Sequence, residues 1–167
     1  MVRLEFSLRD LRNFLVRSKL TAFAGEGRRR KLKKMKIYSF SNGEWSYEDR
    51  YLGNLTDIGT EVVRYRGYPV WAMSYRGGIF ADSRDMSSED FRFLKKALRK
   101  VSKRLPARGP RTFSEGAWCY LNSCEGDIAD FWGIEYVTYK GRRVYDHRYF
   151  GGLVRDHSFS VSITRPY

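Results

Sequence analysis

The sequence predicts an α+β fold with two layers, in which a unit of one helix and three antiparallel strands occurs twice about a pseudo-twofold axis. The first observation behind this is an internal repeat, because residues 40–57 recur 73 positions later and residues 59–78 recur 74 positions later. The second is an amphipathic helical segment before each copy. A sheet with one apolar face needs a cover, which two such helices can supply.

The repeat matches aromatic, glycine and glutamate residues at corresponding positions. The matched pairs include Phe40 with Phe113, Gly43 with Gly116, Trp45 with Trp118, Tyr47 with Tyr120, Glu61 with Glu135 and Tyr75 with Tyr149. A chain of 167 residues can bury a core without staples, so we predict one domain. Repeat 1 spans about 7–80, repeat 2 about 87–155, and a C-terminal tail strand covers 158–164.

The two predicted helices cover residues 7–23 and 87–104. Ser7 followed by Asp10 is a capping-box pattern that places the start of the first helix. Apolar residues recur at helical spacing in both segments: Leu8, Leu11, Phe14 and Leu15 in the first, and Phe91, Leu94, Leu98 and Val101 in the second.

The predicted strands alternate apolar and polar residues and are joined by glycine turns. They cover 45–51, 61–65 and 70–75 in the first copy, and 118–122, 134–139 and 144–149 in the second. The turns are Arg66-Gly67 and Lys140-Gly141. Residues 28–36 carry seven positive charges in nine positions, and such density predicts an exposed loop.

Positive charge is the strongest functional lead. The net charge is +13, and the excess lies in residues 1–36, with twelve Lys and Arg against three acids, and in residues 87–112, with nine against two. We expect a nonspecific surface for nucleic acid or another polyanion. Its predicted residues are Arg28, Arg29, Arg30, Lys31, Lys33, Lys34, Lys96, Arg99, Lys100 and Lys103. The alternative is a solvated helix whose cations suit its negative C-terminal end.

An aromatic pocket between the repeats is the alternative function. A small-ligand or sensory domain would line such a pocket with Trp71, Tyr75, Tyr145, His147 and Tyr149. His147 stands where the first copy has Met73, so any site using it would work in one half only. The alternative is that most of these aromatic residues are core packing.

An enzyme is less favoured, and no catalytic residue is predicted. Glu61 and Glu135 each begin a buried-looking strand face, either as an acid pair or as structural carboxylates that pair with an Arg or cap a backbone turn. No metal and no cofactor is expected, because Cys119 and Cys124 belong to no Cys/His cluster. These cysteines are either two reduced thiols or a bridge across a bend. The glycine pairs follow strands and predict no phosphate loop.

No apolar run is long enough to cross a membrane, and the N-terminus lacks a continuous apolar segment, so we expect a cytoplasmic protein without a membrane partner. The sequence gives no oligomeric state.

Several short motifs resemble a prokaryotic and archaeal domain family of unknown function over roughly residues 8–155. They are Tyr65-Arg66-Gly67, Val70-Trp71-Ala72-Met73, Arg108-Gly109-Pro110, Glu125-Gly126-Asp127, Tyr139-Lys140-Gly141 and Tyr149-Phe150-Gly151-Gly152. The resemblance implies a small standalone cytoplasmic protein, or in some relatives a domain fused to a helix-turn-helix regulator. It implies no activity, and the run 28–36 is outside its pattern.

Overall fold

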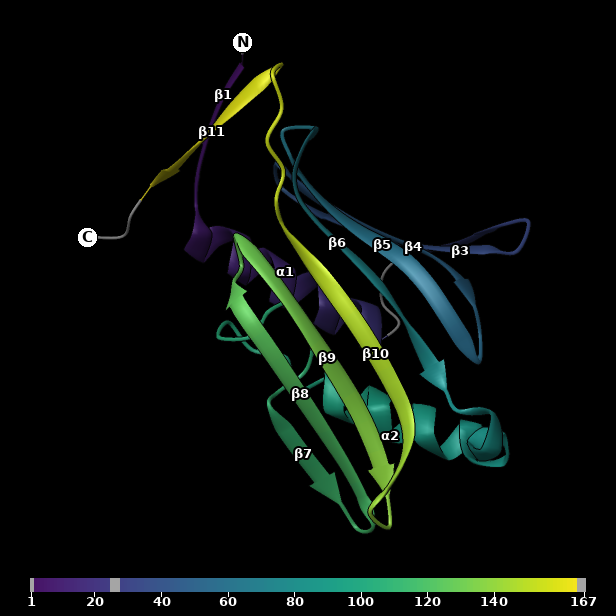
Figure 1. Cartoon of the computed structure of the whole chain (residues 1–167). Helices are drawn as coiled ribbons and strands as arrows, with labels where there is room; N and C mark the ends of the chain where they lie inside the picture. Colours follow the sequence, from purple (N-terminus) through teal and green to yellow (C-terminus); the bar gives the residue numbers. More distant parts are fainter. Residues whose placement is uncertain (1, 25–27, 165–167) are drawn as a thin grey trace.

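A single large antiparallel sheet dominates the protein, whose computed structural model describes residues 2–24 and 28–164 (Figure 1). Nine strands follow one another across it in the order β2-β3-β4-β5-β6-β10-β9-β8-β7. Their bounds are Arg28–Leu32 for β2, Met35–Asn42 for β3, Trp45–Gly53 for β4, Thr56–Tyr65 for β5, Tyr68–Ile79 for β6, Thr112–Glu115 for β7, Trp118–Asp127 for β8, Asp130–Tyr139 for β9 and Arg142–Leu153 for β10.

The predicted fold class is therefore wrong. The chain is mostly β, with two α-helices among the described residues, and it is not a balanced duplication of a helix and three strands. The prediction missed β2, β3 and β7, which widen both ends of the sheet. It also underestimated the length of the strands predicted at 70–75 and 144–149, because β6 and β10 are each 12 residues long.

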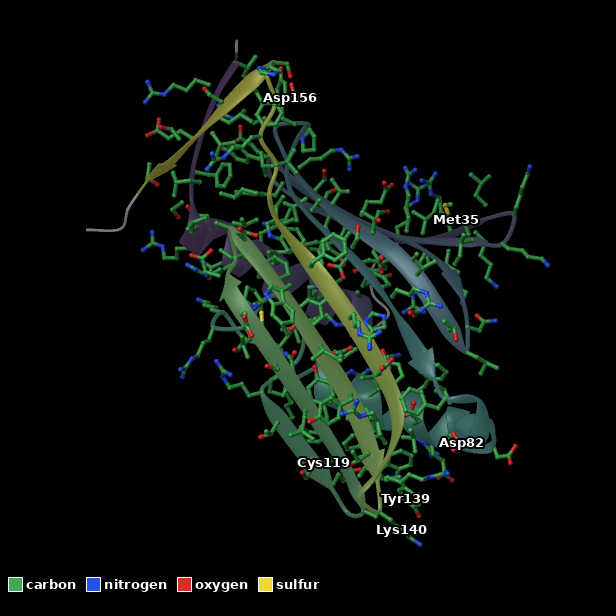
Figure 2. The ribbon with its side chains drawn as sticks, in the orientation of Figure 1. Met35, Asp82, Cys119, Tyr139, Lys140 and Asp156 are labelled. Atoms are coloured by element: carbon green, nitrogen blue, oxygen red, sulfur yellow. The ribbon has the colours of Figure 1, made fainter. Side chains whose placement is uncertain are left out.

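The basic stretch 28–36, predicted as a loop, forms the β2–β3 hairpin. Arg28 pairs with Ser39 and Leu32 with Met35, and Met35 is labelled in Figure 2. All five residues of β2 are exposed, because β2 is the edge strand and its side chains extend into solvent. Dense charge disfavours burial, but it does not prevent backbone pairing at a sheet edge.

The two helices lie against one face of the sheet, behind it in Figure 1. Helix α1 spans Leu8–Ala24, and the predicted capping box at its start is confirmed. The Ser7 hydroxyl accepts the Asp10 amide at 3.0 Å and donates to the Asp10 carboxylate at 2.6 Å. Helix α2 spans Ser87–Leu98 and follows the short 3₁₀ helix η1, Ala81–Met86, which contains Asp82 of Figure 2.

The strands that carry the repeated sequence meet at the centre of the sheet. There β6 pairs with β10, and Tyr75 lies opposite its counterpart Tyr149. Around this pair, Met73 faces Gly151 and His147 faces Gly77, which are corresponding contacts in the two halves. Both predicted turns have the positive φ angles that two-residue hairpins need, 53° and 83° at Arg66-Gly67 and 49° and 80° at Lys140-Gly141.

Two apolar clusters fill the space under the helices. The larger joins α1 to β3–β6, and the smaller joins α2 to β8–β10. Strand β1, Val2–Ser7, pairs in parallel with the tail strand β11, Phe159–Thr164, in a separate two-stranded sheet. The opposite face of the large sheet is uncovered and exposes Trp132 and Phe150 side by side. None of the helices is long and apolar enough to cross a membrane, over the residues described.

Candidate functional site

A cavity of about 550 Å³ lies between the helices and the concave face of the sheet. Its walls come from β3–β6 and β10, from both helices and from the β2–β3 hairpin. Segments that are far apart in the sequence therefore converge on one space. Its lining mixes apolar and polar side chains, and the ionisable side chains in it and next to it fall into four groups.

The first group is a buried ion pair that joins α1 to the sheet. The Lys19 ammonium donates to the Glu61 carboxylate of β5 at 2.5 Å, and both side chains are almost inaccessible to solvent. Burial lowers the pKa of Lys19, although the charge of Glu61 opposes that shift. Lys19 could have been found in the sequence, since it follows Leu11 and Leu15 at intervals of four on the apolar stripe of the helix.

The second group is the matching pair in the other half. Arg108 donates to Glu135 of β9 through Nε at 3.1 Å and also through a terminal nitrogen. Tyr120 donates to the other oxygen of Glu135 at 2.5 Å. Burial alone would raise the pKa of Glu135, but the Arg108 guanidinium holds it below its usual value. Each of the two glutamates thus has a cationic partner from outside the sheet.

The third group surrounds His147 of β10. Its Nε2 lies 2.9 Å from the Asp57 carboxylate, and its Nδ1 lies 3.7 Å from Glu135. The imidazole stacks on Tyr145 with ring centroids 5.8 Å apart and contacts Tyr75 at 5.1 Å. The Nδ1 atom is buried and has no hydrogen-bond partner among the described residues. It is therefore a buried polar atom with unused bonding capacity.

The fourth group is Asp49 of β4, which the sequence analysis missed. The Tyr75 hydroxyl donates to Asp49 Oδ1 at 2.6 Å, and Asp49 lies in register opposite Glu61 on β5. Burial, together with the like charge of Glu61, raises the pKa of Asp49 to about 7. A signal existed in the sequence, because Asp49 continues the inward-facing alternation of Trp45 and Tyr47.

Cations from two separate segments surround the mouth of the cavity. Arg29, Arg30 and Lys31 come from β2, and Lys95 comes from α2. One guanidinium nitrogen of Arg29 already donates to the Ala22 carbonyl near the end of α1, at 3.1 Å. Arg30, Lys31 and Lys95 are exposed and form no ion pair within the described part of the chain.

The predicted pocket residues are divided by the structure. Tyr75, Tyr145 and His147 line the cavity. Tyr149 lines a smaller cavity of about 100 Å³ in the second half instead. Trp71 is fully buried, stacks on Phe131 and donates to the Ile128 carbonyl at 2.9 Å, so it belongs to the core.

The predicted polyanion surface is divided as well. Arg29, Arg30 and Lys31 border the cavity, whereas Lys33 and Lys34 form the turn of the hairpin. Lys96 lies toward β7 and pairs with Glu115. Arg28, Arg99, Lys100 and Lys103 are exposed outside the cavity lining. The structure thus brings three of the ten predicted cations together at one site.

The described part of the chain contains no group of three or more His, Cys, Asp or Glu side chains that could hold a metal ion. Cys119 and Cys124 lie on the same strand, β8, and both are free thiols.

The fold and the cavity define a mostly β protein with a ligand-sized space between its helices and its sheet. The family described as "Domain of unknown function (DUF5680)" matches residues 49–154, and the chain belongs to this family. The match begins at Asp49 and includes Glu61, Arg108 and His147, so these cavity-lining residues lie within the family domain. Neither a curated protein nor a solved structure matches the chain.

Proposed function

We propose that the protein is a ligand-binding domain whose cavity takes a small organic anion. The observation that carries the proposal is the convergence of cations from β2 and α2 on the mouth of a 550 Å³ cavity. That volume lies within the range of small-molecule sites, about 300–1,000 Å³. Unpaired cations at a concave opening attract anions and raise their rate of entry.

The interior favours a ligand that is partly apolar and partly polar. Tyr145 and Phe91 offer aromatic surface, and Leu94 and Leu98 of α2 add aliphatic surface. Asp49 and His147 each present polar atoms that the fold does not fully satisfy. A few polar groups in an otherwise apolar wall fix the orientation of a bound molecule.

The test is a thermal-shift screen followed by calorimetric titration. The screen includes aliphatic, aromatic and phosphorylated anions with neutral analogues of the same size. A ligand at 100 times its Kd stabilises the native state by about 2.7 kcal/mol. For a chain of this size we expect a rise in Tm of roughly 5–10 °C. Anions that raise Tm when their neutral analogues do not support the proposal.

Charge reversal at the mouth locates the site. The triple variant Arg30→Glu, Lys31→Glu and Lys95→Glu should abolish the shift without lowering the Tm of the free protein. The matched control is Arg76→Glu, which reverses an exposed charge on β6 outside the cavity. Binding that survives the triple variant, or that is lost equally in the control, contradicts the proposal.

Binding of a polyanion along the hairpin is a second candidate function, favoured by the complete exposure of β2 at the sheet edge. Fluorescence anisotropy with labelled single- and double-stranded nucleic acid at two salt concentrations tests it. Lys33→Glu with Lys34→Glu should weaken this binding and leave small-anion binding intact, because the hairpin turn lies outside the cavity lining. Absence of binding at low salt eliminates this candidate.

A further inference from the structure

The two halves of the sheet carry the same hydrogen bond with one difference of residue type. The Tyr75 hydroxyl donates to Asp49 at 2.6 Å, and the Tyr149 hydroxyl donates to Asn122 at 2.6 Å. Asn122 is the counterpart of Asp49 in the repeat, 73 positions later. Each lies in register opposite a buried glutamate, Asp49 opposite Glu61 and Asn122 opposite Glu135.

In the second half the protein itself completes this arrangement. The Asn122 amide donates through Nδ2 to the Gly109 carbonyl at 3.1 Å. Residues 106–109 are buried. Gly109 lies so close to Tyr120 that an added Cβ would approach its hydroxyl to 2.8 Å. A backbone carbonyl thus fills the space over Tyr120 and Asn122, and the cavity that remains is about 100 Å³.

In the first half the corresponding place is open. Tyr47 and Asp49, the counterparts of Tyr120 and Asn122, both line the 550 Å³ cavity. Asp49 Oδ1 accepts from Tyr75, and Oδ2 has no hydrogen-bond partner among the described residues. The first half therefore presents an unfilled position where the second half holds a peptide carbonyl.

We infer that the ligand of the proposed function is an organic anion with a carbonyl oxygen, which occupies the counterpart of the Gly109 position and accepts a hydrogen bond from protonated Asp49. This rests on the proposed function and specifies the class of ligand. The anionic end then reaches Arg30, Lys31 and Lys95 at the mouth. An amide or keto oxygen fits, since the group it replaces is a peptide carbonyl.

The surroundings of Asp49 support the neutral form as donor. Burial and the adjacent Glu61 raise its pKa to about 7, so a proton is present at and below neutral pH. The titratable or charged groups that face it come from four elements and from the segment after α2. They are Tyr38 of β3, Glu61 of β5, Tyr75 of β6, Lys19 of α1, and Arg108. Lys19 and Arg108 oppose protonation, but each is engaged by a glutamate.

The test uses N-acetylated amino acids as probes, each carrying an amide carbonyl and a carboxylate, beside carboxylic acids of equal length without the amide. Wild-type affinity for the N-acetyl compounds should fall about tenfold for each pH unit above 7, as Asp49 loses its proton. Asp49→Asn keeps a donor at every pH, as Asn122 does. It should bind within about threefold of wild type at pH 6 and lose the pH dependence.

Asp49→Leu removes the donor and should weaken binding by about tenfold at pH 6. Circular dichroism and Tm establish that each variant is folded. An Asp49→Asn protein that binds more than tenfold more weakly than wild type at pH 6, or that retains the wild-type pH profile, overturns the inference. If other anions bind through the basic mouth but the N-acetyl compounds do not, this inference fails and the proposed function stands. If no anion binds, both fail.

Discussion

Replacing Arg108 by methionine should strongly destabilise the protein, because it leaves Glu135 buried without its cation. Glu135 is fully buried and accepts two hydrogen bonds from Arg108, so only the one from Tyr120 remains in the variant. Breaking a buried ion pair by removing one partner costs about 3–5 kcal/mol. For a chain of this size the fall in Tm is roughly 6–20 °C.

The loss should depend on pH in a defined direction. In the wild-type protein the pKa of Glu135 lies below its usual value, so this group stabilises the fold above the unfolded pKa and less as pH falls through the folded pKa. Without Arg108, burial raises that pKa, and the native state takes up a proton more readily than the unfolded chain. The difference in unfolding free energy between wild type and variant should therefore shrink from pH 7 to pH 5.

Urea denaturation followed by tryptophan fluorescence at the two pH values measures this difference. The double variant Arg108→Met with Glu135→Leu should recover to within about 1 kcal/mol of wild type, because it removes both buried charges. Lys96→Ala is the control, since it breaks the half-exposed pair with Glu115 and should cost less than about 1 kcal/mol. A cost for Arg108→Met no larger than that of the control would refute the reasoning.

Three further outcomes are expected from the same denaturation assay. Gly77→Ala should lower the free energy of unfolding by about 3 kcal/mol or more, since its Cβ would lie 2.4 Å from the His147 Cα. Gly67→Ala meets no atom within 4 Å and should cost about 1 kcal/mol, because its φ is positive. Trp71→Phe should cost about 2 kcal/mol, through a smaller ring and an unsatisfied Ile128 carbonyl. His147→Met, which installs the residue found at the corresponding place of the first half, should leave stability within about 2 kcal/mol of wild type and abolish anion binding. Equal costs at the two glycines, a silent Trp71 variant, or full binding by the His147 variant would contradict these expectations.

Local chemistry made some elements predictable from the sequence. The start of α1 depends on Ser7 and Asp10, three residues apart, and the capping bonds form between those two. The turns at Arg66-Gly67 and Lys140-Gly141 depend on residues that adopt positive φ. In each case the sequence signal and the physical cause lie within a few residues of one another.

The errors involved contacts between distant parts of the chain. The fold class was wrong because β2, β3 and β7 were missed. For example, β2 joins the sheet only through its pairing with β3, whose Ile37 and Tyr38 are buried. The cation partners of the two glutamates were missed because Lys19 lies 42 residues from Glu61 and Arg108 lies 27 residues from Glu135. Charge patterns in a sequence give no information about such pairings until the sheet order is known.

The unequal covering of the two halves explains why the large cavity reaches Tyr47 and Asp49, whereas only about 100 Å³ remains beside Asn122. After α2 the chain passes back over the sheet, and residues 106–109 bury themselves against Tyr120 and Asn122. After α1 the chain instead continues into the β2–β3 hairpin at the edge of the sheet. Nothing among the described residues covers Tyr47 and Asp49 in the same way, and the hairpin places Arg30 and Lys31 at the opening.

The same difference accounts for the choice of aspartate or asparagine at the corresponding positions. Beneath a fixed backbone carbonyl, an amide supplies a permanent donor without the cost of burying a charge. Next to an open cavity, a carboxyl group donates a hydrogen bond when it is protonated and only accepts when it is ionised. Asp49 can therefore change its role with pH, whereas the amide nitrogen of Asn122 always donates. The duplicated strands thus form the same arrangement twice, and the chain segment after each helix determines whether the protein fills the space beside them or leaves a cavity.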